Sequence, residues 1–188
     1  MMISHIKLLV SVIIAGMFIL IIRQASLNLR EQSHEQVSNA ITAHRAQHIT
    51  DLLQFDLKRI GMSTNGQAAI VTAEPHRIVF NSDLDLDGTV ETISYYLSDS
   101  SAASATDNPS DKILYRVVDN EPEIDVPLGV TEFELKYYNW TRGEETTDLD
   151  SIRTIEVILE LQNTYSIDDD YSGYAWRTSI SPPNLMLN

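Results

Sequence analysis

The sequence predicts an α+β fold, in which a long N-terminal helix, made of a membrane segment and a stem, packs on an antiparallel β-sheet. The first 60 residues contain no proline and only one glycine, Gly16, so nothing forces a helix to break there. After Gly61 the apolar residues change from helical spacing to alternation, which is typical of strands. We therefore predict three parts: a membrane anchor at 1–22, a helical stem at 23–60 and an acidic antiparallel-sheet head domain at 61–188.

The anchor is predicted from an uncharged run at 8–22. This run suits a single membrane span, the apolar part of a cleaved secretory signal or a buried core helix. No small-x-small cleavage site follows Ile22 closely, which favours an uncleaved anchor. The residues expected to contact lipid or neighbouring helices are Leu8, Leu9, Ile13, Ile14, Met17, Phe18 and Ile21.

The stem continues the helix, which would be about 80 Å long if unbroken up to Ile60. Apolar residues become more frequent after Ile49, so we expect the last turns to pack against the sheet. The predicted packing residues are Ile49, Leu52, Leu53, Phe55 and Ile60. Gly61 suits the left-handed position that ends many helices.

The head reads as a succession of short strands joined by turns. Alternating or β-rich segments lie at 69–72, 77–81, 89–97, 112–119, 131–140, 152–162 and 174–180. Short links between them predict a single antiparallel sheet. Its apolar face needs a cover, and the end of the stem is the one amphipathic element available.

Charge and composition narrow the function. From Gly61 onward seven Lys/Arg stand against 23 Asp/Glu, a balance of −16, which disfavours binding to nucleic acid. The chain has no cysteine, which excludes disulfides, cysteine-ligated metals and thiol catalysis. No phosphate-binding glycine loop or catalytic triad order occurs, so we expect no enzyme activity. We expect a single-pass protein of the bacterial inner membrane, with its head in the periplasm or outside the cell.

One stretch of the head could hold a metal ion. Residues 83–91 match the first half of an EF-hand calcium loop, with Gly88 at its sixth position and carboxylates at positions 1, 3, 5 and 9: Asp83, Asp85, Asp87 and Glu91. Ser94 replaces the glutamate usual at position 12. The alternative is a plain hairpin turn at Asp87-Gly88, with Leu84 and Leu86 pointing inward.

A second metal-binding pattern lies in the stem. His44 and His48 are four residues apart on one helix face, and Asp51 follows them. This spacing can bind zinc, but it equally suits a solvated helix face.

The layout resembles the type IV pilin and pseudopilin superfamily, and the head is most similar to J-type minor pseudopilins of type II secretion and to PilW-type minor pilins. The stretches that carry this resemblance are 77–80 with 83–91, 113–116, 128–133 and 152–157. The N-terminal prepilin motif is not matched, because no acidic residue precedes Glu31. The resemblance implies a non-enzymatic subunit whose helix packs with other pilin-like subunits or with copies of itself.

A different function also fits the sequence. The chain could serve as a single-span, membrane-tethered binding module outside the cytoplasm, with calcium stabilising its head. It would hold a partner through a sheet edge or through the polar loop at 98–110.

Overall fold

A computed structural model describes residues 2–104, 106–119, 124–125, 129–140, 144–164, 166 and 171–186, with side chains described except at 2–9, 31, 34–35 and 124–125. The chain divides into two compact units, Met1–Ala40 and Ile41–Asn188. The boundary falls inside the predicted stem, so the last helical turns belong to the same unit as the strands.

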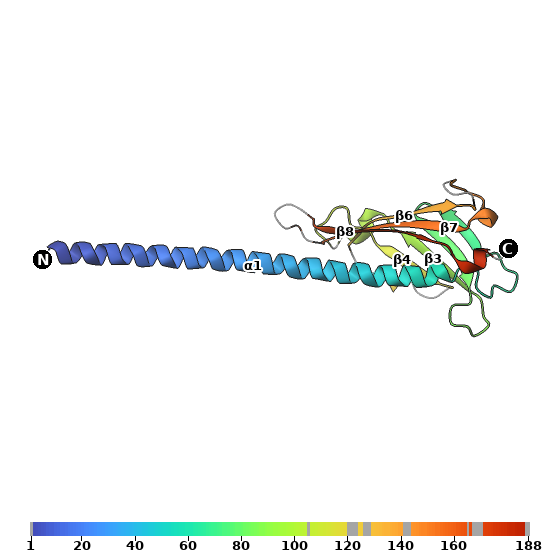
Figure 1. The fold of residues 1–188 in the computed structure, drawn as a ribbon, viewed down its shortest axis with the longest axis horizontal. Coiled ribbons are helices and arrows are strands. Elements are labelled where there is room, and N and C mark those ends of the chain that lie inside the picture. Colours follow the sequence, from blue (N-terminus) through green and yellow to red (C-terminus); the bar gives the residue numbers. More distant parts are fainter. Residues whose placement is uncertain are drawn as a thin grey trace. The chain divides into compact units, whose positions relative to one another are not determined.

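The N-terminal helix is a single element, α1 (Met2–Lys58), labelled in Figure 1. The absence of helix-breaking residues thus predicted its extent correctly. Lys58 lies in the last turn, where a positive charge favours the helix dipole. Gly61 follows with φ +77° and donates its N–H to the Asn81 carbonyl at 3.0 Å. A side chain there would be strained by that dihedral, so glycine is what lets the chain turn into the head.

The strands form two antiparallel sheets, which corrects the prediction of one. The first sheet pairs β1 (Ile70–Glu74), β2 (Arg77–Ser82), β3 (Glu91–Leu97), β4 (Leu114–Val118) and β5 (Ile124–Asp125) in chain order. The second pairs β6 (Val130–Tyr138), β7 (Thr154–Gln162) and β8 (Gly173–Ile180). Short 3₁₀ turns occupy Ser100–Ala103, Leu149–Ser151 and Pro183–Met186. Alternation shows which face of a strand is buried, but it does not reveal which strand pairs with which. The division of the strands into two sheets was therefore not predictable.

The two sheets are joined by backbone contacts. Lys112 forms an isolated antiparallel bridge with Val130, and its N–H donates to the Val130 carbonyl at 2.7 Å. The Leu135 N–H donates to the Pro75 carbonyl at 2.7 Å. These bonds hold β6 next to the first sheet without making one continuous ladder.

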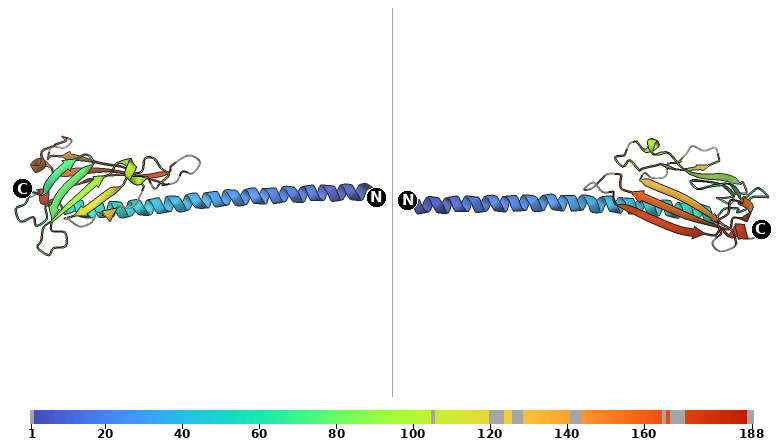
Figure 2. Two further views of the ribbon diagram at one scale, coloured as in Figure 1. Left: turned by 180° about the vertical axis from the view of Figure 1, so that it is seen from behind. Right: turned by 90° about the horizontal axis from the view of Figure 1, so that it is seen from above.

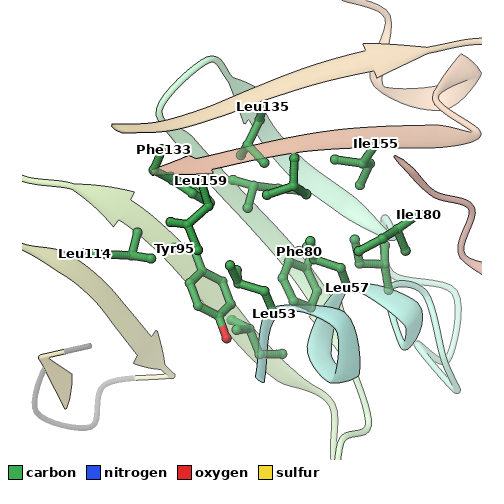
Figure 3. Close-up of a cluster of buried hydrophobic side chains, with 14 of the residues drawn as sticks. Leu53, Leu57, Phe80, Tyr95, Leu114, Phe133, Leu135, Ile155, Leu159 and Ile180 are labelled. Carbon is green, nitrogen blue, oxygen red and sulfur yellow. The ribbon is translucent and has the colours of Figure 1, made fainter. Parts of the chain in front are cut away.

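One hydrophobic core unites both sheets with the end of α1 in the unit Ile41–Asn188. Figure 2 shows the cyan end of α1 lying against the strands in both views. Figure 3 shows side chains from three sources meeting there: Leu53 and Leu57 from α1, Phe80 and Tyr95 from the first sheet, and Phe133, Leu135, Ile155, Leu159 and Ile180 from the second. The alternation at 131–140 and 152–162 predicts that every second residue points inward, and the core confirms it. The buried residues are Phe133, Leu135 and Tyr137 in β6 and Ile155, Val157, Leu159 and Leu161 in β7.

The predicted packing residues of the stem are mostly, but not all, correct. Ile49, Leu53 and Ile60 are buried, whereas Leu52 lies at the edge and is half-buried. Phe55 was wrongly predicted, because its side chain is 51% exposed. It is two residues from Leu53, and at about 100° per residue this places it on the opposite helix face. There the Arg59 guanidinium lies 3.5 Å from its ring centroid.

Candidate functional site

The first candidate site is the apolar part of α1. Val10–Arg30 is long and apolar enough to cross a membrane, and by the same test it also resembles a signal sequence. At 1.5 Å per residue its 21 residues match the roughly 30 Å hydrocarbon core of a bilayer. Residues 10–30 are all exposed, so the core-helix alternative is wrong for this structure.

The described members of the predicted lipid-facing set share one broad side of this helix, and the exposed residues Val12, Ile19, Leu20 and Ile22 make its other sides apolar as well. The described members of the set, all exposed, are Ile13, Ile14, Met17, Phe18 and Ile21. The side chains of Leu8 and Leu9 lie outside the described residues. A helix that is apolar all round is unstable in water, so this surface needs lipid or other helices around it.

The second feature is a polar contact that fastens α1 to the first sheet. Asp56 of α1 is fully buried, and its Oδ2 accepts from the Tyr95 hydroxyl at 2.6 Å and from Arg116 Nε at 2.7 Å. Arg116 Nε also lies 3.2 Å from the Tyr95 hydroxyl oxygen. Asp56 Oδ1 has no hydrogen-bond partner among the residues that the structure describes. One helix and two strands, β3 and β4, thus share one buried ion pair, and we call the triad Asp56, Tyr95 and Arg116 the helix clasp.

Burial and the neighbouring charges shift the pKa of two members of the helix clasp, Tyr95 and Arg116. Burial, followed by the nearby Asp56 carboxylate, raises the pKa of the Tyr95 phenol, so its hydroxyl remains a donor. Burial lowers the pKa of Arg116, but the hydrogen bond to Asp56 and its charge outweigh this, and the net pKa is raised. The Tyr95 hydroxyl therefore stays neutral and Arg116 stays charged throughout the physiological pH range.

This triad was not predicted from the sequence. Its one visible signal was a carboxylate, Asp56, between Leu53 and Leu57 on the packing side of the helix. An acid at such a position needs a buried cation or donor. The partners could not be found from the sequence, because Tyr95 and Arg116 lie 39 and 60 residues away.

The third candidate is the acidic loop 83–91, between β2 and β3. Asp83, Asp85 and Glu91 each offer a carboxylate oxygen, and these three oxygens all lie within 4.8 Å of one another. Glu91 Oε2 accepts the Leu84 N–H at 2.8 Å, and Asp83 Oδ2 accepts the Gly88 N–H at 3.2 Å. The loop therefore folds back on itself and gathers three of the four carboxylates predicted for a metal site.

Asp87 is the predicted ligand that the structure leaves out of this group. Its Oδ1 accepts the Thr89 N–H at 2.7 Å, and hydrogen bonds from the Thr89 backbone and side chain lower its pKa. β2 and β3 form an antiparallel hairpin, as the alternative predicted, but their connection spans 83–90 and is longer than a turn at Asp87-Gly88 alone. Leu86 has φ +64° and is exposed, whereas Leu84 packs at the core edge as expected.

The stem histidines do not form a comparable site. His44, His48 and Asp51 are all exposed, and among the described residues the acidic loop is the one place where three or more such ligands converge.

Comparison of the chain with protein-family models, with curated proteins and with solved structures found no match.

Proposed function

We propose that this protein is a non-enzymatic, pilin-like or pseudopilin-like subunit of an envelope filament or secretion assembly, anchored by its N-terminal helix. The observation that carries the proposal is the helix α1 itself. One end of it is apolar on every face and exposed, and the other end is fixed into a folded α+β unit by a buried core and the helix clasp. Such a chain is suited to presenting a helix to lipid and to other helices.

Exposed apolar side chains beyond the membrane segment support helix-to-helix assembly. Val37 and Ile41 are four residues apart on one side of α1 and are 55% and 47% exposed. A membrane anchor alone does not require apolar residues in the stem, but contact between neighbouring stems does.

Single-cysteine cross-linking tests the proposal directly, because the natural chain has no cysteine. Ser11→Cys and Ser26→Cys place thiols on the exposed apolar helix, and Ser101→Cys places one on an exposed turn of the head. In membranes, oxidation should yield disulfide-linked dimers for the helix positions and few for Ser101→Cys. Monomers alone at both helix positions, across expression levels, would refute an assembly built through α1.

A membrane-tethered binding module is the second candidate. It is favoured by the absence of an acidic residue before Glu31, where pilin-like proteins are expected to carry a glutamate early in the mature helix. Mass spectrometry of the N-terminus of the membrane-bound protein separates the two. A cleaved and methylated terminus supports the assembly subunit, and an intact Met1 together with monomeric behaviour supports the tethered module.

A further inference from the structure

We propose that the loop 83–91 is a calcium site in which Asp83, Asp85 and Glu91 hold the ion. This goes beyond the assembly function, since it would hold for either a filament subunit or a lone anchored module. Asp83 and Asp85 lie on the loop between β2 and β3, and Glu91 is the first residue of β3. The proposal depends on the burial and hydrogen bonding of Asp83 as well as on the proximity of the three carboxylates.

Asp83 is a buried carboxylate with an unused oxygen. The residue is only 4% exposed, and Oδ2 accepts the Gly88 N–H, but Oδ1 has no hydrogen-bond partner among the described residues. Burying a carboxylate oxygen without a partner is strongly unfavourable, because the oxygen loses its hydrogen bonds to water and forms none in their place. A cation beside Oδ1 supplies the missing interaction.

No cationic side chain among the described residues forms an ion pair with these carboxylates. The ion pairs found among the described residues join Arg116 to Asp56, Lys136 to Glu134 and Arg177 to Glu156, and none of them reaches the loop. The three loop carboxylates therefore repel one another at short range. One divalent ion offsets two of their three charges.

The spacing of the oxygens suits calcium. Calcium–oxygen distances of about 2.3–2.6 Å place opposite ligands of one ion roughly 4.6–5.2 Å apart. Oxygens that lie within 4.8 Å of one another can thus contact a single calcium ion. Magnesium requires a regular octahedron with shorter distances, about 2.0–2.1 Å, and it usually keeps several waters. Carboxylates alone, without imidazole or thiolate, do not favour zinc.

The loop backbone and its anchor points hold this arrangement. Gly88 has φ +93°, the conformation that lets the chain turn and direct its N–H at Asp83. Glu91 is the first residue of β3, and its carboxylate accepts the Leu84 N–H. Asp83 directly follows the last residue of β2, so two of the proposed ligands are held next to strand ends. Ser94 lies within β3, paired with Val79 and Val117, and offers no bidentate carboxylate. The expected dissociation constant is therefore about 10⁻⁴–10⁻³ M, the range of extracellular calcium modules.

The test uses the full chain in mild detergent after removal of divalent ions with a chelator. Calcium titration by calorimetry should give saturable binding with one ion per chain, and about 5 mM calcium should raise the thermal midpoint by several degrees. The same concentration of magnesium should raise it by less than half as much. No heat and no shift in the midpoint at about 10 mM calcium would overturn the proposal.

Matched variants assign the ligands. Asp85→Asn and Glu91→Gln should each weaken calcium binding at least about tenfold, because each removes a charged ligand. Asp85 is exposed, so its replacement does not disturb the core even if an Asp83 variant fails to fold. Asp99→Asn, at an exposed carboxylate outside the loop whose side chain caps no helix, should bind calcium like the natural protein. Unchanged affinity in both loop variants, or an equal loss in Asp99→Asn, would show that any binding is diffuse attraction to an acidic surface.

Discussion

Removing Asp56 from the helix clasp should loosen α1 from the first sheet. In Asp56→Ala, Arg116 and the Tyr95 hydroxyl lose their shared acceptor, and their environment offers little water: the Arg116 side chain is 15% exposed and Tyr95 is fully buried. Breaking a buried ion pair by deleting one partner costs about 3–5 kcal/mol. Because Arg116 keeps some access to solvent, we expect about 3 kcal/mol, the lower end of that range.

A graded series around the triad separates its parts. Tyr95→Phe removes the hydrogen bond to the Asp56 carboxylate and the longer one from Arg116 Nε, but it leaves the ion pair, so the loss should be about 1.5–2 kcal/mol. A triple replacement with Leu at 56, Phe at 95 and Met at 116 removes the whole triad. It should recover most of the stability, because well-packed apolar residues often replace a buried pair without loss.

Urea unfolding of the full chain in detergent measures these changes. Both tryptophans of the chain, Trp140 and Trp176, lie in the unit Ile41–Asn188 and report on its unfolding. With a slope of about 2 kcal/mol per molar urea, a loss of 3 kcal/mol moves the midpoint by about 1.5 M. Glu134→Ala is the control, because its pair with Lys136 is long, at 3.8 Å, and solvent-accessible. That variant should stay within about 0.5 kcal/mol. If Asp56→Ala behaves like Glu134→Ala, the clasp does not hold the helix.

Three further predictions concern the same folded unit. Leu53→Ala should destabilise the unit by about 2–5 kcal/mol, because it leaves a cavity in the core. Phe55→Ala, on the exposed face of the helix, should cost less than about 1 kcal/mol. Equal urea midpoints for the two variants would contradict the assigned helix face. Burial raises the pKa of the Asp111 carboxyl, partly opposed by Thr106 and Arg45, so the native state holds its proton to higher pH than the unfolded chain does. The contribution of Asp111 to the free energy of unfolding should therefore fall as pH rises above the ordinary pKa of 3.8. Thermal midpoints should show Asp111→Asn to be more stable than the natural protein at pH 7 but not in acid. A stability advantage of the variant that grows towards low pH would contradict the direction of this pKa shift. Gly129→Ala should lower the thermal midpoint markedly, because φ at Gly129 is +105° and an added Cβ would lie 2.7 Å from the Gln162 carbonyl oxygen. A midpoint equal to that of the natural protein would contradict this backbone geometry.

Local sequence patterns predicted part of the hydrophobic core and part of the candidate metal site. The alternation in β6 and β7 identified their inward faces, and the EF-hand-like spacing identified the acidic loop. The spacing did not reveal that Glu91, and not Asp87, lies next to Asp83 and Asp85. This depends on which carboxylates the folded loop brings together. Asp87 instead satisfies the backbone N–H of Thr89.

The sequence by itself determined the elements: a helix without breakers up to Lys58, a reversal at Gly61 and strands whose period of two marks their buried sides. These follow from backbone sterics and local apolar spacing, which act within a few residues. Only the tertiary structure decided that the strands divide into two sheets and that Asp56 pairs with Arg116. Both depend on contacts between distant parts of the chain. Such contacts form where burying a charge or closing a core is favourable, and no local pattern encodes them.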